Sequence, residues 1–316
     1  MADLLDRKLL FVTGKGGVGK TTISAGLALM AASRGKRALV CEVDAKGDLA
    51  ASFEAPPTRF QESQVAPNLW AMSMDSEASL RQYLSLQLRL PRAAGLGVVA
   101  RMFDFVASAA PGVREIVTVG KLCWEVRERH YDIVVVDAVA SGHIVGQLAA
   151  PQAINGLVQV GLVRQQTGWM LDILGDPATT GLVVVATPAE MPVSETLELT
   201  DRVRSETNVD LAAVVVNRVL PELFARGEEG VFERLSESQE LRDPLEQGLG
   251  GSLAPLLEAA RLTVTMRRSR TEHLERLRNA VDPSIPMLYM PYLFFRAHGL
   301  RATHQIADAL SAELGY

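Results

Sequence analysis

Cysteine is scarce in this chain, and its scarcity excludes several kinds of site. Only two of the 316 residues are cysteines, Cys41 and Cys123. They form no C-x-x-C pair, so neither a zinc site nor a redox motif of that type is expected. Each lies in an apolar pattern, so we expect both thiols in or near the core. A chain of this kind is typical of the reducing cytoplasm, where we expect it to work.

Long apolar runs and basic blocks are also absent. No apolar run approaches the roughly 18 residues that a membrane-spanning helix needs, so no integral membrane span is expected. Residues 1–8 lack the order of charged and apolar residues found in a signal peptide. The net charge is −5 and no basic block occurs, so nucleic acid is not an expected partner.

Lysine is also scarce, and it marks one stretch of the chain. There are 6 lysines against 26 arginines, and two of the six lie in one glycine-rich segment of nine residues. This segment consists of Gly14, Lys15, Gly16, Gly17, Val18, Gly19, Lys20, Thr21 and Thr22. It follows an apolar run at 9–12 and precedes a helical pattern at 23–32. Strand, glycine loop and helix form the context in which G-x-x-x-x-G-K-[ST] binds phosphate.

The chemistry of this loop fits a nucleotide and Mg²⁺. Glycines let backbone N–H groups wrap an anion, and the following helix adds its positive end. Lys20 would reach the β- and γ-phosphates, and the Thr21 hydroxyl would bind Mg²⁺. Lys15 is a compact ammonium group in a chain that otherwise uses arginine. A glycine-rich turn that binds nothing, with a solvated Lys15, is the alternative.

Buried strand patterns alternate with helical patterns along the chain. We expect strands at 9–12, 37–43, 69–74, 130–137, 181–187, 212–216 and 285–290. This alternation predicts an α/β fold with a mostly parallel, doubly wound sheet flanked by helices. Ligands bind beyond the carboxyl ends of such strands. The glycine loop, Asp44 and Asp137 all lie there.

The two aspartates fit the chemistry of phosphoanhydride hydrolysis. Asp137 follows an apolar strand. In P-loop nucleotide hydrolases an aspartate at such a position holds Mg²⁺, directly or through water. Asp44 would orient or deprotonate the attacking water. For either aspartate alone, capping of the next turn is the alternative.

Two helical segments interrupt the alternating pattern within what we interpret as one domain, 1–316. The first, at about 75–129, is a helical insertion with helices expected at 76–90, 94–109 and 112–128. Its stretch 96–106 is apolar around most of the helix, which fits either a buried helix or the wall of an apolar groove. The second segment lies at about 220–282. Residues 138–143 are expected to form a loop.

Taken together, these motifs resemble the deviant-Walker P-loop ATPases, which carry K-G-G-x-G-K-[ST]. Within that class the chain resembles the family of arsenite-pump ATPases and guided-entry-of-tail-anchored-protein ATPases, also called anion-transporting ATPases. Residues 44–53 resemble the first switch of that family, D-P-A-H-N-L-S-D-A-F, and residues 137–143 resemble the second, D-T-A-P-T-G-H. Further likenesses are Pro111-Gly112 with Glu115, Glu195-Thr196, Val216-Asn217-Arg218 and Pro291-Tyr292-Leu293.

This resemblance implies a dimeric Mg²⁺-dependent ATPase that uses ATP, closest to the paired single-domain members of bacteria. In such a dimer Lys15 would reach the γ-phosphate of the ATP bound to the partner. Asn217 would recognise adenine, and Pro291 and Tyr292 would close over the base. The partner would be a second copy or a homologous subunit. A protein or membrane-protein client would be handled by the helical insertion.

Departures from the family pattern leave other functions open. The chain lacks the zinc-binding C-x-x-C and the cysteine cluster of arsenite-responsive relatives, so arsenite pumping is not expected. Ala138 and Ala140 replace a threonine and a proline of the second switch, which fits a non-hydrolysing subunit of a heterodimer as an alternative. Another alternative is a spatial-positioning ATPase of the partition or septum-site type. The C-terminal helix at 302–314 has no lysine and is a poor match for anionic lipid.

Overall fold

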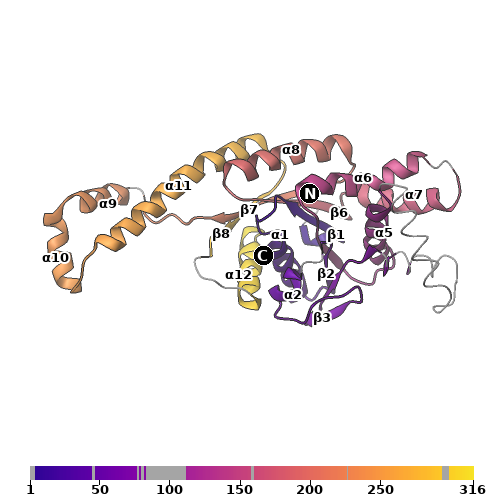
Figure 1. Cartoon of the computed structure of the whole chain (residues 1–316), viewed down its shortest axis with the longest axis horizontal. Helices are drawn as coiled ribbons and strands as arrows, with labels where there is room; N and C mark the ends of the chain where they lie inside the picture. Colours follow the sequence, from indigo (N-terminus) through magenta and orange to yellow (C-terminus); the bar gives the residue numbers. More distant parts are fainter. Residues whose placement is uncertain are drawn as a thin grey trace.

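The structure is a computed structural model, and it places a sheet at the centre of the chain (Figure 1). It describes residues 4–44, 47–76, 78–79, 82, 112–157, 160–225, 227–293 and 299–316. The predicted helices at 76–90 and 94–109, including the apolar stretch 96–106, lie almost wholly outside the described residues.

The central sheet has eight strands in the order β3-β4-β2-β5-β1-β6-β7-β8. Their bounds are β1 Leu9–Gly14, β2 Ala38–Glu42, β3 Ser63–Ala66, β4 Leu69–Ser73, β5 Ile133–Asp137, β6 Thr180–Ala186, β7 Leu211–Val219 and β8 Met287–Pro291. All neighbouring strands pair in parallel except β3 and β4, which pair antiparallel. The predicted α/β fold with a mostly parallel sheet is confirmed.

The antiparallel strand β3 was not expected from the sequence. Its four residues, Ser-Gln-Val-Ala, are exposed or half-buried, so they carry no apolar run. The strand forms because Ser63 and Gln64 pair with Ala71 and Trp70 of β4 at the edge of the sheet. Pairing with a neighbour, rather than an intrinsic preference of these residues, therefore creates this strand.

Helices cover both faces of the sheet (Figure 1). Their bounds are α1 Lys20–Ser33, α2 Asp48–Ser52, α5 Val113–Arg127, α6 Ser141–Leu157, α7 Leu162–Gly175, α8 Glu190–Glu206, α9 Glu228–Glu237, α10 Gln239–Leu249, α11 Ala254–Ala280 and α12 Leu300–Glu313, with a short 3-10 turn at Leu4–Asp6. The predicted loop at 138–143 is wrong at its end, because α6 already begins at Ser141.

The alternation of side chains along β1 shows how the two layers are held. Leu10 and Val12 pack into the core cluster that contains α1 and α12, whereas Leu9 and Phe11 pack into the cluster formed by α5 to α8. All four side chains are fully buried. A strand covered on both faces is expected to be apolar throughout, as β1 is.

Both cysteines lie in the core, as predicted, and both belong to the second cluster. Cys41 and Cys123 are free and fully buried. Burial raises the pKa of each thiol far above its usual value. They therefore behave as core side chains and not as reactive groups.

Helices α9, α10 and the first half of α11 project away from the sheet as an arm (Figure 1, left). Neither α9 nor α10 contains a buried residue. The other end of α11 is anchored, because Leu277 is fully buried against Val193 of α8 and Val216 of β7. The arm is thus rooted beside the end of β7.

Candidate functional site

The glycine loop lies at the carboxyl edge of the sheet, between the end of β1 and the start of α1. Gly14 has φ 148°, and a Cβ there would lie 2.1 Å from the carbonyl oxygen of Val185 on β6. Gly19 has φ 98°, and a Cβ there would lie 2.4 Å from Nδ2 of Asn217. Other residues avoid such φ values and would clash at both positions. The backbone of the loop can therefore come close to a bound anion.

A cavity of about 680 Å³ opens beside this loop, within the size range of small-molecule sites. The predicted loop residues that line it are Gly16, Gly17, Gly19, Lys20, Thr21 and Thr22, whereas Gly14, Lys15 and Val18 do not. The N-cap residue of α1 is Gly19, which has no side chain to cap the helix. The positive end of this helix therefore faces the cavity, as phosphate binding requires.

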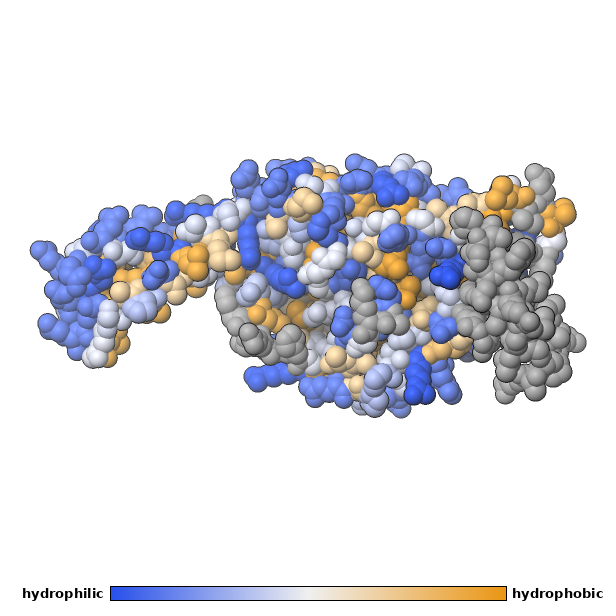
Figure 2. Space-filling model, viewed as in Figure 1, coloured by the Kyte–Doolittle hydropathy of each residue, from blue (hydrophilic) through white to orange (hydrophobic). Residues whose placement is uncertain are grey.

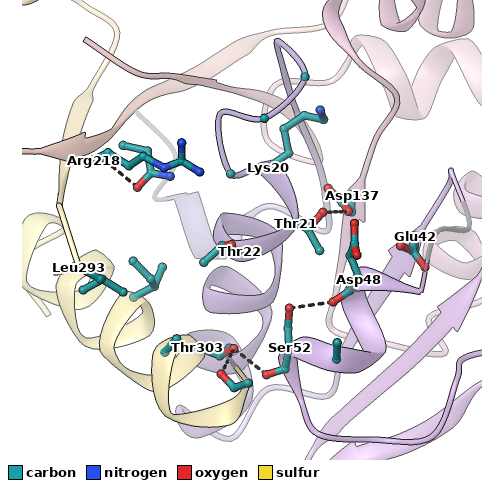
Figure 3. A pocket seen from close by; sticks show the side chains of 18 of the residues that line it. Lys20, Thr21, Thr22, Glu42, Asp48, Ser52, Asp137, Arg218, Leu293 and Thr303 are labelled. Atoms are coloured by element: carbon teal, nitrogen blue, oxygen red, sulfur yellow. Dashed lines mark hydrogen bonds between the residues drawn. The ribbon is translucent and has the colours of Figure 1, made fainter. Parts of the chain in front are cut away.

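Carboxylates gather on one side of the cavity and Arg218 lies on the other (Figure 3). Asp137, Asp48 and Glu42 lie near Thr21, and Arg218 and Leu293 lie across from them. Asp44 also lines the cavity and follows β2 by two residues. The glycine loop, Asp44 and Asp137 therefore line one cavity, as expected for residues at the carboxyl edge of a parallel sheet.

Asp137 is held by two hydroxyl groups from α1. Thr21 Oγ1 donates to Asp137 Oδ2 at 2.6 Å, and Ser24 Oγ lies 3.3 Å from Oδ1. The aspartate ends β5, and it lies between β1 and β2 in the sheet, in register with Val12 and Glu42. Thr21 and Asp137 therefore place adjacent oxygen atoms at the cavity wall.

Burial raises the pKa of Asp137 to about 6. The hydrogen bond from Thr21 and the charge of Lys20 oppose this shift, while the neighbouring Glu42 carboxylate adds to it. A carboxylate with a pKa near 6 loses part of its charge in weakly acidic solution. Its affinity for a cation should fall there.

The same shift predicts how stability depends on pH in the absence of nucleotide and metal. Because the folded pKa of Asp137 lies above 3.8, the folded chain binds more protons than the unfolded chain between these values. The contribution of Asp137 to stability should therefore fall as the pH rises, by roughly 2 to 3 kcal/mol between about pH 4 and pH 7. Urea unfolding of the wild type and of Asp137→Asn measures this, since the variant lacks the titration. A difference between the two proteins that does not change with pH would contradict the prediction.

Glu42 is a site residue that sequence reasoning missed. Glu42 is 2% exposed, and its Oε2 accepts from the backbone N–H of Gly47 at 3.2 Å and from Ser73 Oγ at 3.3 Å. Glu42 therefore ties the segment after Asp44 to the sheet. The sequence contained a sign of this role, because Glu42 ends an otherwise apolar strand of five buried residues.

The other side of the cavity is formed by the ends of β7 and β8. Asn217 is 5% exposed, and its Nδ2 donates to the carbonyl oxygen of Val18 at 2.8 Å. Its Oδ1 accepts from the backbone N–H of Arg218 at 2.9 Å. Pro291 ends β8, and the backbone N–H of Tyr292 donates to Val219 O at 2.8 Å. Asn217, Pro291 and Tyr292 thus line the same cavity as the glycine loop.

Lys15 is directed away from this cavity. Its ammonium group forms an ion pair with the Glu195 carboxylate of α8. The second oxygen of that carboxylate accepts from Ser141 Oγ, at the start of α6, at 3.3 Å. The predicted loop lysine, the Glu195-Thr196 segment and the second switch region therefore meet at one point.

The oxygen ligands at Thr21 and Asp137 fit Mg²⁺, which prefers hard oxygen donors. No group of three or more His, Cys, Asp or Glu in the described part of the chain could hold a metal ion. Mg²⁺ usually binds through one or two carboxylates together with phosphate oxygens of the substrate. The donors present therefore fit a metal that arrives with a nucleotide.

Comparison with known proteins gives the family. The model of the anion-transporting ATPases matches residues 7–170 and 163–243. This chain belongs to the anion-transporting ATPase family. ATPase BagA of Mycobacterium tuberculosis is 32% identical over 225 residues, which cover 68% of this chain and 66% of that protein. ATPase GET3 of Podospora anserina is 28% identical over 177 residues, 54% of this chain and 52% of that protein.

The matched part of the anion-transporting ATPase model includes most of the site. The glycine loop, Asp44, Asp137, Glu195 and Asn217 lie within it, whereas Pro291 and Tyr292 lie beyond its end. The matches span 66% or less of these two relatives' own lengths. Among the described helices, none combines the length and the apolar character needed to cross a membrane.

Proposed function

We propose that this chain is a Mg²⁺-dependent ATPase whose site is completed by a second subunit. The observation that carries the proposal is the convergence of Lys20, Thr21 and Asp137 on one cavity, in a member of an ATPase family. The glycine loop and the start of α1 would bind the triphosphate, and Lys20 would offset its charge. Asp44, at the cavity wall, would orient the attacking water.

Thr21 and Asp137, the latter directly or through water, would hold the Mg²⁺. The metal would neutralise charge on the β- and γ-phosphates. Glu42 would keep the segment that carries Asp44 in place through its bond to Gly47. With phosphate binding and an oriented water in place, little covalent chemistry is left for the protein to supply.

Asn217 is suited to recognise adenine. Its amide uses one N–H on Val18 and one oxygen lone pair on Arg218. One donor and one acceptor remain, and these are what the N6 and N7 edge of adenine requires. Pro291 and Tyr292 would then close over the base.

Lys15 would serve a nucleotide bound by another subunit, a second copy of this chain or a homologous one. Its side chain does not line the cavity of its own loop, which supports such a role. The ion pair with Glu195 would have to open before Lys15 could cross a dimer interface. Dimer closure and hydrolysis would then be coupled.

A protein or membrane-protein client in the cytoplasm would respond to this switch. The arm offers such a client an apolar surface. Eight of the thirteen exposed large apolar side chains among the described residues lie on or beside the arm: Leu223, Val231, Leu241, Leu245, Leu249, Leu256, Leu262 and Met266. Orange patches along the arm in Figure 2 mark apolar residues on this face. Exposed apolar surface of this kind is typical of interaction sites.

Phosphate release and light scattering on the same purified sample test this proposal. We expect turnover with ATP and Mg²⁺, loss of turnover in EDTA, and a dimer with ATP that is weaker with ADP. Lys8→Ala is a suitable control, because Lys8 is exposed and precedes β1. Turnover only after a homologous subunit is added would indicate a heterodimer. No turnover in either case would exclude ATPase activity. Turnover by a monomer would exclude a coupling of hydrolysis to dimer closure.

A further inference from the structure

Arg218 has an unusual backbone conformation at the end of β7. Its φ is +60°, in the left-handed region that residues other than glycine rarely adopt. The pairing of β7 with β8 shifts register here, because Val216 pairs with Tyr289 and Val219 pairs with Pro291. Two residues of β7 therefore oppose one residue of β8, which is a β-bulge. Such bulges redirect a side chain, and they are common next to active sites.

Hydrogen bonds hold the bulge in place. The Arg218 N–H donates to Asn217 Oδ1 at 2.9 Å, and Arg270 of α11 donates to the Arg218 carbonyl oxygen at 3.5 Å. The Arg270 guanidinium also lies 5.9 Å from the centre of the Tyr292 ring. Neighbouring elements therefore maintain a strained conformation, which is typical of functional positions.

The bulge directs the Arg218 side chain into the cavity. The side chain is exposed and lines the cavity, and Figure 3 shows its guanidinium extending from β7 over the space between Lys20 and Leu293. No hydrogen bond or ion pair with any described residue engages the guanidinium. The strained backbone of Arg218 thus presents to the cavity a planar cation that no described residue binds by a hydrogen bond or an ion pair. Such an arrangement indicates a ligand.

We propose that Arg218 binds the purine ring of ATP by stacking its guanidinium on the face of the base. This rests on the proposed ATPase function and adds a residue to its base site. Asn217 presents its amide to the edge of the ring, and Arg218, the next residue, presents a flat cation. Guanidinium groups stack on aromatic faces, whereas the lysine ammonium is a point charge. Asn217 and Pro291, the predicted adenine residues, line the same cavity as Arg218.

Arg218→Gly tests this role without disturbing the fold. Glycine adopts φ +60° readily, so the variant should unfold at the same or higher urea concentration than the wild type without nucleotide. Calorimetry should show affinity for ATP about tenfold weaker. Affinity for inorganic tripolyphosphate, which has no base, should be unchanged. Arg234→Ala, which removes an exposed arginine of the arm, is the matched control and should change neither affinity.

Each outcome distinguishes this role from its alternatives. An unchanged ATP affinity in Arg218→Gly would overturn the proposal. An equal loss for tripolyphosphate would also overturn it, because the guanidinium would then serve the phosphates. Arg218→Lys separates stacking from charge, and it should lose most of the ATP affinity that glycine loses. A wild-type protein that binds no ATP would instead contradict the proposed ATPase function.

Discussion

Alanine in place of Lys20 should lower the rate of ATP turnover by a factor on the order of 10²–10³. Lys20 begins α1 and lines the cavity beside Thr21, so its ammonium is placed to offset charge on the phosphates. Because that charge is present in bound ATP and grows in the transition state, both ATP affinity and kcat should fall. Steady-state phosphate release and calorimetric ATP binding measure the two effects.

The control for this experiment is again Lys8→Ala, at the other end of β1. Its turnover should equal that of the wild type. The urea unfolding curve of Lys20→Ala should also stay close to that of the wild type, since no core contact is removed. Turnover of Lys20→Ala within twofold of the wild type would show that this loop is not the catalytic site.

Alanine in place of Lys15 should lower kcat by a factor on the order of 10³ or more, with little change in KM. A charge supplied to the γ-phosphate from a second subunit acts mainly in the transition state, as an arginine finger does. Lys15 does not line the cavity of its own chain, so binding of ATP to that chain should survive. Dimerisation with ATP should be retained, and light scattering checks this.

Glu195→Gln separates the two roles that Lys15 can have. In this chain Lys15 pairs with Glu195, and Ser141 donates to the same carboxylate. If Lys15 only held these elements together, Glu195→Gln should lose turnover as Lys15→Ala does. If Lys15 acts on a phosphate, the glutamine variant should keep its turnover, because the lysine is released more easily.

The loop and the sheet were predictable because their signals are local. Gly14, Gly17 and Gly19 have positive φ values that few other residues can adopt, and the apolar runs before Asp44 and Asp137 mark buried strands. Parallel strands then place both carboxylates at one edge. The helical pattern predicted at 23–32 lies within α1, Lys20–Ser33, and Gly35 follows the end of that helix.

The features that were missed have no local pattern of residues that marks them. Strand β3 exists because β4 lies beside it, and the pairing of Lys15 with Glu195 joins residues 180 positions apart. The left-handed conformation of Arg218 gave no signal, because a sequence indicates positive φ mainly through glycine. The resemblance to a family pointed to Glu195 and to the Asn217 segment, but it did not give their contacts.

Mixing two inactive variants tests most directly whether Lys15 completes the site of another subunit. Lys15→Ala keeps Asp44 in its own cavity, and Asp44→Asn keeps Lys15. In a mixed dimer one cavity then has both its own Asp44 and a lysine from the partner. With random exchange between equal amounts of two homodimers, half of the dimers are mixed and each has one complete site, so we expect roughly a quarter of the wild-type turnover to return. A mixture that stays as inactive as either variant alone, although exchange of subunits is verified, would contradict a site shared between subunits.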